Sequence, residues 1–336
     1  MKSLTYTAFY SVLFFCIATA TAQSTTADMN LKGNVWRLFT NKHQAKNIVI
    51  ENNKLVSYEK TVLLNHVDYI FDKKGALLAE NTFNKQDIID ISYIYEYDKS
   101  GRLTEKTIAK SGKILVERTE YKYNPDGKKL QEIDFDNRDS LRSSIAYKYD
   151  SLGKLISEKT YNNVNRLIKN IEYQYDEWGN LLLENSLPTN VYLNRPYQKV
   201  QKFDSKNNCI YKSYTRQDTL QWEYFASYNK KDSLIYEEVK DGNGNLQSYS
   251  KLTYRKNRRI ALVQHQRDAV VPIIETHYQY DKAGKLLTEK LYTPNNKQLL
   301  VIRTYFYDEK GNWIYCLEEE VINKVKNVFS RRFNYF

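Results

Sequence analysis

The amino-acid sequence repeats with a period of about 26 residues, and this repeat restricts the fold more than any other feature. Its clearest copies follow Y-x-Y-D-x-x-G-x-L with single changes, and they begin at Tyr69, Tyr95, Tyr121, Tyr147, Tyr173, Tyr278 and Tyr305. Weaker copies begin at Gln201, Ala226 and Leu252, and a truncated copy begins at Arg331. Self-similarity at such a period is typical of an array in which each unit packs on its neighbours. The sequence therefore predicts one array and not two independent domains.

Each repeat has the pattern of an antiparallel β-hairpin. Tyr95 and Tyr97 are expected on one face of a strand, with Glu96 on the other. After the turn, Leu103 is expected across the hairpin from Tyr97, since aromatic and aliphatic cross-strand pairs stabilise a sheet. Asp98 is a residue type that bonds backbone N–H groups two residues further on and so holds a turn. The unit is predicted to have a Tyr/Leu face and a Lys/Glu/Gln face.

The chain has 30 tyrosines and only 11 glycines, so the positions of the glycines are informative. Seven of them lie three residues after the Asp position of a repeat: Gly75, Gly101, Gly127, Gly153, Gly179, Gly284 and Gly311. In weaker copies this position holds Asn207, Asp232 and Arg258. Glycine, and to a lesser degree Asn and Asp, tolerates a positive φ. One left-handed residue per turn is therefore expected, whereas the connections between hairpins vary in sequence and are expected to vary in form.

These observations predict an all-β fold, an array of about eleven antiparallel β-hairpin repeats over residues 67–336. A flat array would be roughly 100 Å wide with a bare tyrosine face, which a soluble protein does not tolerate. The array is expected to roll into a spiral, an open barrel or a curved solenoid, with the tyrosines as its core. Residues 23–66 are expected to cap its start, and the last strand, residues 328–336, to cap its end.

Residues 1–22 have the pattern of a secretory signal peptide. Lys2 precedes an apolar run, and Ala20-Thr21-Ala22 is a small-residue cleavage site. We expect an exported protein, in the periplasm, on the outer surface or outside the cell. A lipid anchor at Cys16 is a less favoured alternative, because bulky Phe15 precedes it. No further stretch has 18 apolar residues, so no transmembrane helix is expected.

Two further alternatives concern the exported chain. Cys209 and Cys316 could form a disulfide if the array folds back, but the simpler interpretation is two small buried apolar residues. An outer-membrane barrel would carry an apolar band on its outer face. Every second residue before Phe336 lies on the same face of the last strand, and these residues are polar: Asn334, Arg332 and Ser330. The last strand therefore lacks the apolar face of a membrane strand, which does not favour that alternative.

The motif Y-x-Y-D-x-x-G-x-L resembles the YD repeat of the Rhs/teneurin-type family, over about residues 67–336. In that family, hairpin repeats coil into large hollow β shells. Bacterial members can enclose a toxin, and animal members are cell-surface adhesion proteins. The resemblance implies that the repeated Tyr and Asp residues are structural and not catalytic. The chain looks like a short exported bacterial member, and its repeats look too few to close a large cage.

Two sites for a ligand are predicted, both at turns. Trp178 lies within the turn 175–179 and could stack on a sugar ring, or else pack on the neighbouring turn. Arg255, Lys256, Arg258 and Arg259 crowd one divergent turn, which could bind a phosphate or an acidic glycan. The simpler interpretation of that cluster is a solvated turn.

Signals for catalysis and for metal binding are weak. None of the four histidines stands in an H-E-x-x-H motif, and neither a nucleophile elbow nor a phosphate-binding loop occurs. The segment 241–245 resembles the start of a calcium loop, but its twelfth position is Leu252 where a glutamate is required. The repeated Asp residues could bind cations, yet turn capping already explains them. We expect neither an enzyme nor a cofactor.

The sequence favours a non-enzymatic exported scaffold or binding protein, with a cell-surface polysaccharide or protein as partner. The alternatives are an envelope component of an Rhs-like export or toxin system and, less favoured, a hydrolase on a repeat scaffold. Nucleic acid is a poor partner, because the net charge of +11 is spread along a chain of mixed charge.

Overall fold

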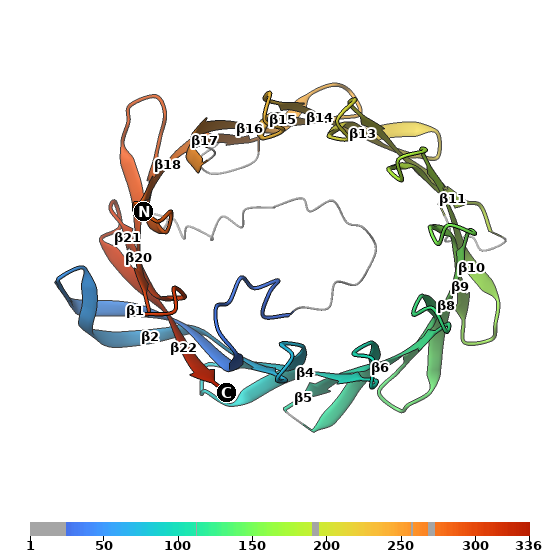
Figure 1. The fold of residues 1–336 in the computed structure, drawn as a ribbon, viewed down its shortest axis with the longest axis horizontal. Coiled ribbons are helices and arrows are strands. Elements are labelled where there is room, and N and C mark those ends of the chain that lie inside the picture. The colour runs from blue at the N-terminus through green and yellow to red at the C-terminus, as the bar shows by residue number, and fades with distance from the viewer. Residues whose placement is uncertain (1–24, 112, 190–194, 257, 268–272) are drawn as a thin grey trace, which may run out of the picture.

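The protein is a closed β-barrel of 22 antiparallel strands (Figure 1). The computed structural model describes residues 25–111, 113–189, 195–256, 258–267 and 273–336, and these residues form no helix. Strands that follow one another in the chain pair with one another, and β1 (Val35–Glu51) also pairs with β22 (Val325–Tyr335). The prediction of an all-β hairpin fold is confirmed. The expectation of a spiral, an open barrel or a curved solenoid is wrong in one respect, because the ring is closed. The expected signal peptide, residues 1–22, lies outside the described residues.

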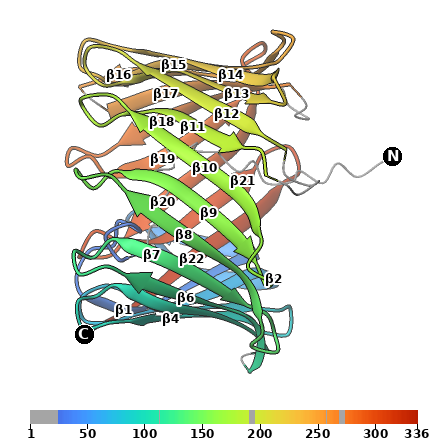
Figure 2. The same ribbon diagram turned by 90° about the vertical axis from the view of Figure 1, so that its right-hand side faces the viewer.

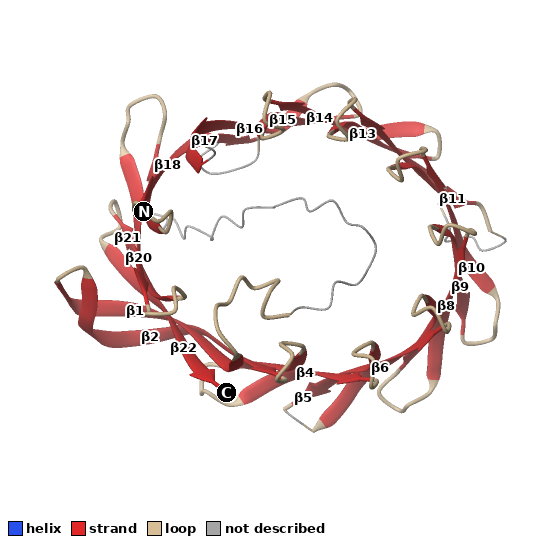
Figure 3. Cartoon of the chain, viewed as in Figure 1, coloured by secondary structure: helices blue, strands red, loops and turns tan. Residues whose placement is uncertain are grey.

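Twenty further strands complete the ring, which Figure 3 colours by secondary structure. They are β2 (Lys54–Phe71), β3 (Leu77–Phe83), β4 (Ile89–Tyr97), β5 (Leu103–Lys110), β6 (Ile114–Tyr123), β7 (Lys129–Phe135), β8 (Leu141–Tyr149), β9 (Leu155–Asn162), β10 (Leu167–Tyr175), β11 (Leu181–Leu187), β12 (Tyr197–Phe203), β13 (Cys209–Arg216), β14 (Thr219–Tyr228), β15 (Leu234–Asp241), β16 (Leu246–Arg255), β17 (Arg258–Gln266), β18 (Ile273–Tyr280), β19 (Leu286–Tyr292), β20 (Leu299–Tyr307) and β21 (Trp313–Glu320). Only β2, with 18 residues, matches the length of β1, with 17. Figure 2 shows the strands running obliquely around the ring.

The turns of the repeat have the geometry that the sequence predicts. Asp98 Oδ1 accepts hydrogen bonds from the backbone N–H of Ser100 at 2.9 Å and of Arg102 at 3.0 Å. Gly101 has a φ of +80°, and its N–H donates to the carbonyl of Asp98 at 2.9 Å. Tyr97 lies opposite Leu103, as expected from the cross-strand pattern. A five-residue turn with one left-handed residue therefore joins the two strands of a hairpin.

The turns at the opposite rim vary in form, as the sequence predicts, but four of those described repeat the turn that begins with Asp or Asn. Asp136 Oδ1 accepts from the N–H of Arg138 at 2.8 Å and of Ser140 at 3.0 Å, while Asp139 has a φ of +59°. The turns that begin at Asn84, Asn162 and Asp241 have the same hydrogen bonds. The calcium-like segment 241–245 is thus one of these turns. Other turns at this rim differ, since Gln217 and Asp218 both have a positive φ, at +48° and +58°.

The tyrosine face of the sheet is the inner wall of the barrel. Residues 25–34 lie inside the ring in Figure 1. Within that segment, Met29 and Leu31 pack in one cluster with Phe71, Tyr69 and Tyr95. Because side chains alternate along a strand, the residues between the tyrosines point outward. At those outward positions Glu96, Lys122 and Lys148 are exposed.

The tyrosines do not form the closed core that the sequence predicts. Among the described tyrosines, only Tyr121 and Tyr173 are less than a tenth exposed, at 9% and 6%. A wall of 22 strands encloses a ring roughly 40 Å across, which side chains from the wall cannot fill. The tyrosines therefore line the wall and leave one side facing the lumen.

The second tyrosine of the motif joins each hairpin to the preceding one through its hydroxyl group. Its O–H donates to the carbonyl of the first residue after the previous turn: Tyr97 to Leu77, Tyr123 to Leu103, Tyr149 to Lys129, Tyr175 to Leu155, Tyr228 to Cys209 and Tyr307 to Leu286, at 2.5–3.0 Å. These bonds repeat around the rim and stabilise the spacing of neighbouring hairpins.

The barrel closes where β1 meets β22, with a register that runs from Val35 opposite Tyr335 to Gln44 opposite Asn327. The segments expected as caps at the two ends of the array thus pair with each other. An inner cluster there includes Val35, Leu38 and Phe71. An outer cluster, which includes Leu317 and Val328, lies under the far end of the β1–β2 hairpin. The buried apolar clusters are therefore at the closure and not along the repeats.

Candidate functional site

Tyrosines and glutamates alternate along the inner wall. The first tyrosine of a repeat lies opposite the residue eight positions after the Asp, and in five hairpins that residue is a glutamate: Tyr69 with Glu80, Tyr121 with Glu132, Tyr147 with Glu158, Tyr173 with Glu184 and Tyr278 with Glu289. We call these ten residues the Tyr–Glu belt. Its members share the inner face, since opposite residues of an antiparallel pair lie on the same side of the sheet.

The hydroxyls of the belt are firm hydrogen-bond donors. Burial raises the pKa of Tyr278 to about 12, and the pKa of Tyr147 and of Tyr173 is raised further by burial and by neighbouring glutamates. Burial also raises the pKa of Glu158, although the hydroxyl of Tyr173 opposes that effect. Near the belt, Tyr197 donates to Glu184 Oε1 at 2.7 Å. Phenol groups of this kind donate to carboxylates and do not ionise.

Basic residues balance the carboxylates of the belt. Lys129 forms an ion pair with Glu132 and also lies over the ring of Tyr147, 4.6 Å from its centroid. Lys199 reaches Glu184 Oε1 at 2.8 Å. The inner wall is therefore polar and of mixed charge, with aromatic rings between the charged groups.

A cavity of about 830 Å³ opens on the inner wall near the closure. Leu291, Leu300 and Phe329 supply apolar surface, and Arg303 bonds Glu318 at 2.9 Å and approaches Glu289 at 3.3 Å. Burial would raise the pKa of Glu318, but Arg303 and Lys42 outweigh it and hold that pKa below its ordinary value. A cavity of this size and mixed lining suits a small polar ligand or one unit of a polymer.

The predicted site residues do not meet at one place. Trp178 is 70% exposed at the tip of the β10–β11 turn, so the structure does not place it against a neighbouring turn. The basic cluster lies at the β16–β17 turn on the same rim, six strands away, or roughly 29 Å along the wall. The two ligand sites predicted at turns are thus separate in space, and each stays a prediction of its own.

The basic turn departs from the repeat geometry. Arg255 pairs directly with Arg258, and the left-handed residue is Lys256, with a φ of +49°. Arg258 donates to the carbonyl of Asp281 at 3.2 Å, and Arg259 stacks on Tyr278 at 4.5 Å from the ring centroid. Two of the four basic residues therefore contact the neighbouring hairpin.

The two cysteines of the described residues are buried, on β13 and β21, and neither is in a disulfide. Cys209 and Cys316 are thus the small buried residues of the simpler interpretation and do not form a disulfide. Burial raises the pKa of Cys316 to about 12, which keeps its thiol protonated.

The sequence contained the signal for the belt. Glu80, Glu132, Glu158, Glu184, Glu237 and Glu289 all stand eight residues after the Asp position of their repeats. The bulge after the turn shifts the alternation by one residue, so simple alternation places this position on the outward face. Once the bulge between Glu96 and Tyr97 is counted, this position falls on the tyrosine face.

No metal-binding group of three or more His, Cys, Asp or Glu residues is present among the described residues. The same part of the chain contains no helix with the length and hydropathy that crossing a membrane requires.

Comparisons with known proteins give a likeness in fold but no named family. A family model described as an uncharacterised protein matches residues 46–143. No curated protein matches the chain.

The chain is similar to a complex of TcdB2, TccC3 and Cdc42, with 14% identity over 90% of this chain and 16% of that one, at a TM-score of 0.49. It is also similar to the Tc holotoxin pore of Photorhabdus luminescens, with 12% identity over 87% of this chain and 20% of that one, at a TM-score of 0.36. A porin-like protein from Bacteroides uniformis has 11% identity over 90% of this chain and 99% of its own, at a TM-score of 0.29. The chain therefore spans a fifth or less of the two toxin chains.

Proposed function

We propose that the protein is an exported, non-enzymatic β-repeat scaffold that binds a cell-surface polysaccharide on the inner wall of its barrel. The Tyr–Glu belt is the observation that carries this proposal. Aromatic rings present an apolar face to the C–H face of a sugar, and the hydroxyl and carboxylate groups bond sugar hydroxyls. A wall whose groups recur with each hairpin matches a polymer whose groups recur with each sugar.

The inner wall is a better candidate than the turns for this role. The tyrosines are half-exposed toward the lumen, as Tyr95 and Tyr147 illustrate. A ligand in the lumen could contact several hairpins at once, whereas Trp178 offers one ring at one turn. Contact with several equivalent groups raises the affinity for a polymer over that for a single sugar.

The test is a glycan array with the purified full chain, followed by titration of each glycan that binds. Glu132→Gln combined with Glu158→Gln should weaken binding about tenfold or more, because each change removes a charged hydrogen-bond acceptor. Glu96→Gln, on the outer face, is the matched control and should leave the affinity unchanged. Circular dichroism establishes that each variant keeps its β structure. Absence of binding to every glycan, or an equal loss in the control, would refute the proposal.

The alternative, an envelope component of an Rhs-like export or toxin system, calls for a polypeptide partner. A pull-down from the native envelope separates the two, because capture of a protein without bound glycan would favour that alternative. Release of reducing sugar from a bound polymer would contradict the non-enzymatic part of the proposal. Fractionation tests export, and an uncleaved chain in the cytoplasm would contradict it.

A further inference from the structure

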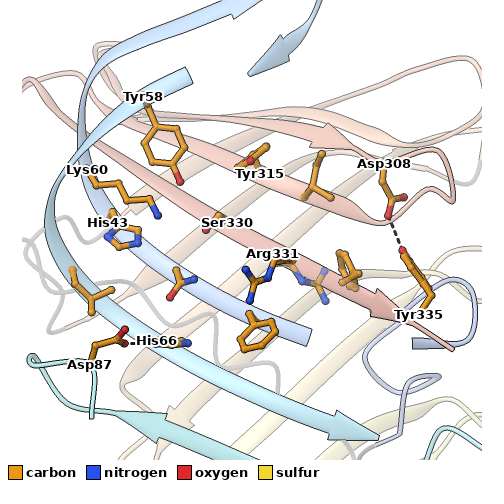
Figure 4. Close-up of a pocket in the computed structure, with 16 residues that line it drawn as sticks. His43, Tyr58, Lys60, His66, Asp87, Asp308, Tyr315, Ser330, Arg331 and Tyr335 are labelled. Carbon is orange, nitrogen blue, oxygen red and sulfur yellow. Dashed lines mark hydrogen bonds and ion pairs between the residues drawn. The ribbon is translucent and has the colours of Figure 1, made fainter. Parts of the chain in front are cut away.

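A second cavity, of about 640 Å³, lies at the closure where β1, β2 and β22 meet (Figure 4). Its volume is in the range of small-ligand sites. Phe39, Tyr58 and Tyr315 supply aromatic surface, with the rings of Tyr58 and Tyr315 edge to face, 6.2 Å apart. The proposed polysaccharide site on the inner wall does not involve these residues.

Basic side chains form a row on the outer face of this seam. Strand pairing places Arg332 beside Phe39, His66 beside Asn41 and Lys60 beside Ala45. His43 lies between the last two on β1. Alternate residues of a strand are about 6.6 Å apart, so the row presents one basic group at each such step. Figure 4 shows His43, Lys60 and His66 around the same opening.

Carboxylates engage His66 in this row but leave Lys60 and Arg332 without an ion pair in the described part of the chain. Among the described residues, neither Lys60 nor Arg332 has a carboxylate within ion-pair distance, although Arg332 stacks on Phe39 at 4.2 Å from the ring centroid. By contrast, Arg37 on β1 forms an ion pair with Asp68 at 2.8 Å. Arg331, which borders the cavity from the inner side of the wall, likewise has no ion pair within the described chain.

His66 has one ring nitrogen held and one without a partner. Its Nδ1 lies 2.5 Å from Asp87 Oδ1, and its ring stacks on Phe83 with centroids 3.9 Å apart. Its Nε2 is buried and has no hydrogen-bond partner in the described structure. Asp87 fixes the hydrogen on Nδ1 when the ring is neutral, and protonation of the ring makes Nε2 a donor as well. A buried nitrogen without a partner, in a cavity with basic neighbours, is the state expected of a ligand donor.

The acidic groups of the lining are already engaged. Asp87 holds His66, and Asp308 accepts a hydrogen bond from the hydroxyl of Tyr335 at 2.8 Å. The basic groups also affect His43. Burial is the largest cause that lowers the pKa of His43, and the nearby Lys60 and His66 lower it further, while Asp87 has the opposite effect. A bound anion would relieve this repulsion.

We propose that this cavity binds an oxyanion of the phosphate class, held by Lys60 and Arg332 and by the rings of His43 and His66. The anion would supply the charge that the row lacks and the acceptor that His66 Nε2 lacks. The site is on the outer face and its occupation does not depend on the polysaccharide proposed for the inner wall.

The experiment is a titration of the full chain with inorganic phosphate, followed by calorimetry and by the histidine C–H signals in NMR. Saturable binding is expected, and phosphate should raise the pKa of His43, because an anion stabilises the imidazolium against Lys60 and His66. Lys60→Met and Arg332→Gln should each weaken binding about tenfold or more. Lys122→Met, an outward strand lysine elsewhere on the wall, is the matched control and should bind as the parent does.

Two further results decide the proposal. A parallel titration with glucose 6-phosphate identifies the source: equal affinity for both indicates free phosphate, and tighter binding of the sugar phosphate indicates a phosphorylated glycan. Failure of the parent protein to bind either anion would overturn the proposal, and so would an unchanged pKa of His43 at saturating phosphate. An equal loss in the Lys122→Met control would also overturn it. Because the pKa of His43 is measured in the parent protein, the test does not depend on how the variants fold.

Discussion

One backbone angle recurs at the turn of the repeats. The glycine three residues after the Asp has a φ between +80° and +94° in seven turns, and Asn207 and Asp232 adopt +66° and +60° at the same position. This region is open to glycine and tolerable for Asn and Asp, but it is strained for a β-branched residue. The few glycines of the chain are therefore located where the backbone requires them.

Gly153→Val should lower the free energy of unfolding by about 1–3 kcal/mol, because valine is strained at the φ of +82° that Gly153 adopts. A Cβ at this position would meet only the mobile end of Lys128, so the backbone conformation and not a steric clash is the main cause. Denaturant unfolding measures the change. Gly153→Asn is the matched control. It should lower the free energy of unfolding much less, because Asn207 adopts the same left-handed conformation at the equivalent position. A valine variant as stable as the parent protein would mean that the turn is not left-handed in solution.

At the scale of the hairpin, one turn geometry serves both rims of the barrel. In the turns that share this geometry, the first residue is an Asp or Asn that accepts backbone N–H groups from the second and fourth residues after it, as at Asp98 and Asp136. These hydrogen bonds favour the ionised carboxylate. They hold the pKa of Asp136 below its ordinary value of 3.8, and the same holds for Asp98, with the N–H of Arg102 as the largest cause.

The lowered pKa values predict that the barrel loses stability in acid. A carboxylate whose pKa is depressed by folding stabilises the native state above its ordinary pKa of 3.8, and this contribution is lost as the pH falls through the lowered value. Asp136→Asn keeps the Oδ1 acceptor and removes the titrating group. The variant should match the parent at pH 7 and lose less stability below pH 3.8. The check is thermal unfolding at a series of pH values, with Asp90→Asn, on strand β4 and not the first residue of a turn, as control. A larger loss of stability in acid for Asp136→Asn would contradict the prediction.

The hairpins and their turns could be predicted from the sequence, because alternation and the left-handed position are local. Three features could not. The bond from Tyr97 to the carbonyl of Leu77 joins two hairpins, and a tyrosine that serves as an apolar residue gives no sign of it. The belt depends on the bulge that places Glu132 opposite Tyr121. The row from Arg332 to Lys60 arises only when β22 meets β1, and its members are far apart in the chain.

At the scale of the whole molecule, closure of the barrel pairs the first strand of the sheet with the last. An open array would leave β1 and β22 with unpaired backbone groups, and such edges pair with other chains. In this barrel the two edges pair with each other over the register from Val35 to Gln44. The inner cluster around Leu38 and the outer cluster around Val328 lie on the two sides of that seam. Side-chain packing at the seam therefore stabilises the closed ring.

Leu38→Ala should lower the free energy of unfolding by about 2–5 kcal/mol, because Leu38 is 1% exposed and its loss leaves a cavity in the inner cluster. The loss should appear first at the seam. Amide hydrogen exchange is expected to speed up in β1 and β22, while β8 to β10 on the far side of the ring stay protected. Since an opened seam exposes two strand edges, the variant should also form dimers at concentrations where the parent is monomeric, as measured by analytical ultracentrifugation. Ile94→Ala, at a half-exposed position of β4, is the control. It should neither speed up amide exchange in β1 and β22 nor form dimers. Uniform loss of protection around the ring would mean that the seam is no weaker than the rest of the wall, and that closure is a property of the repeats themselves.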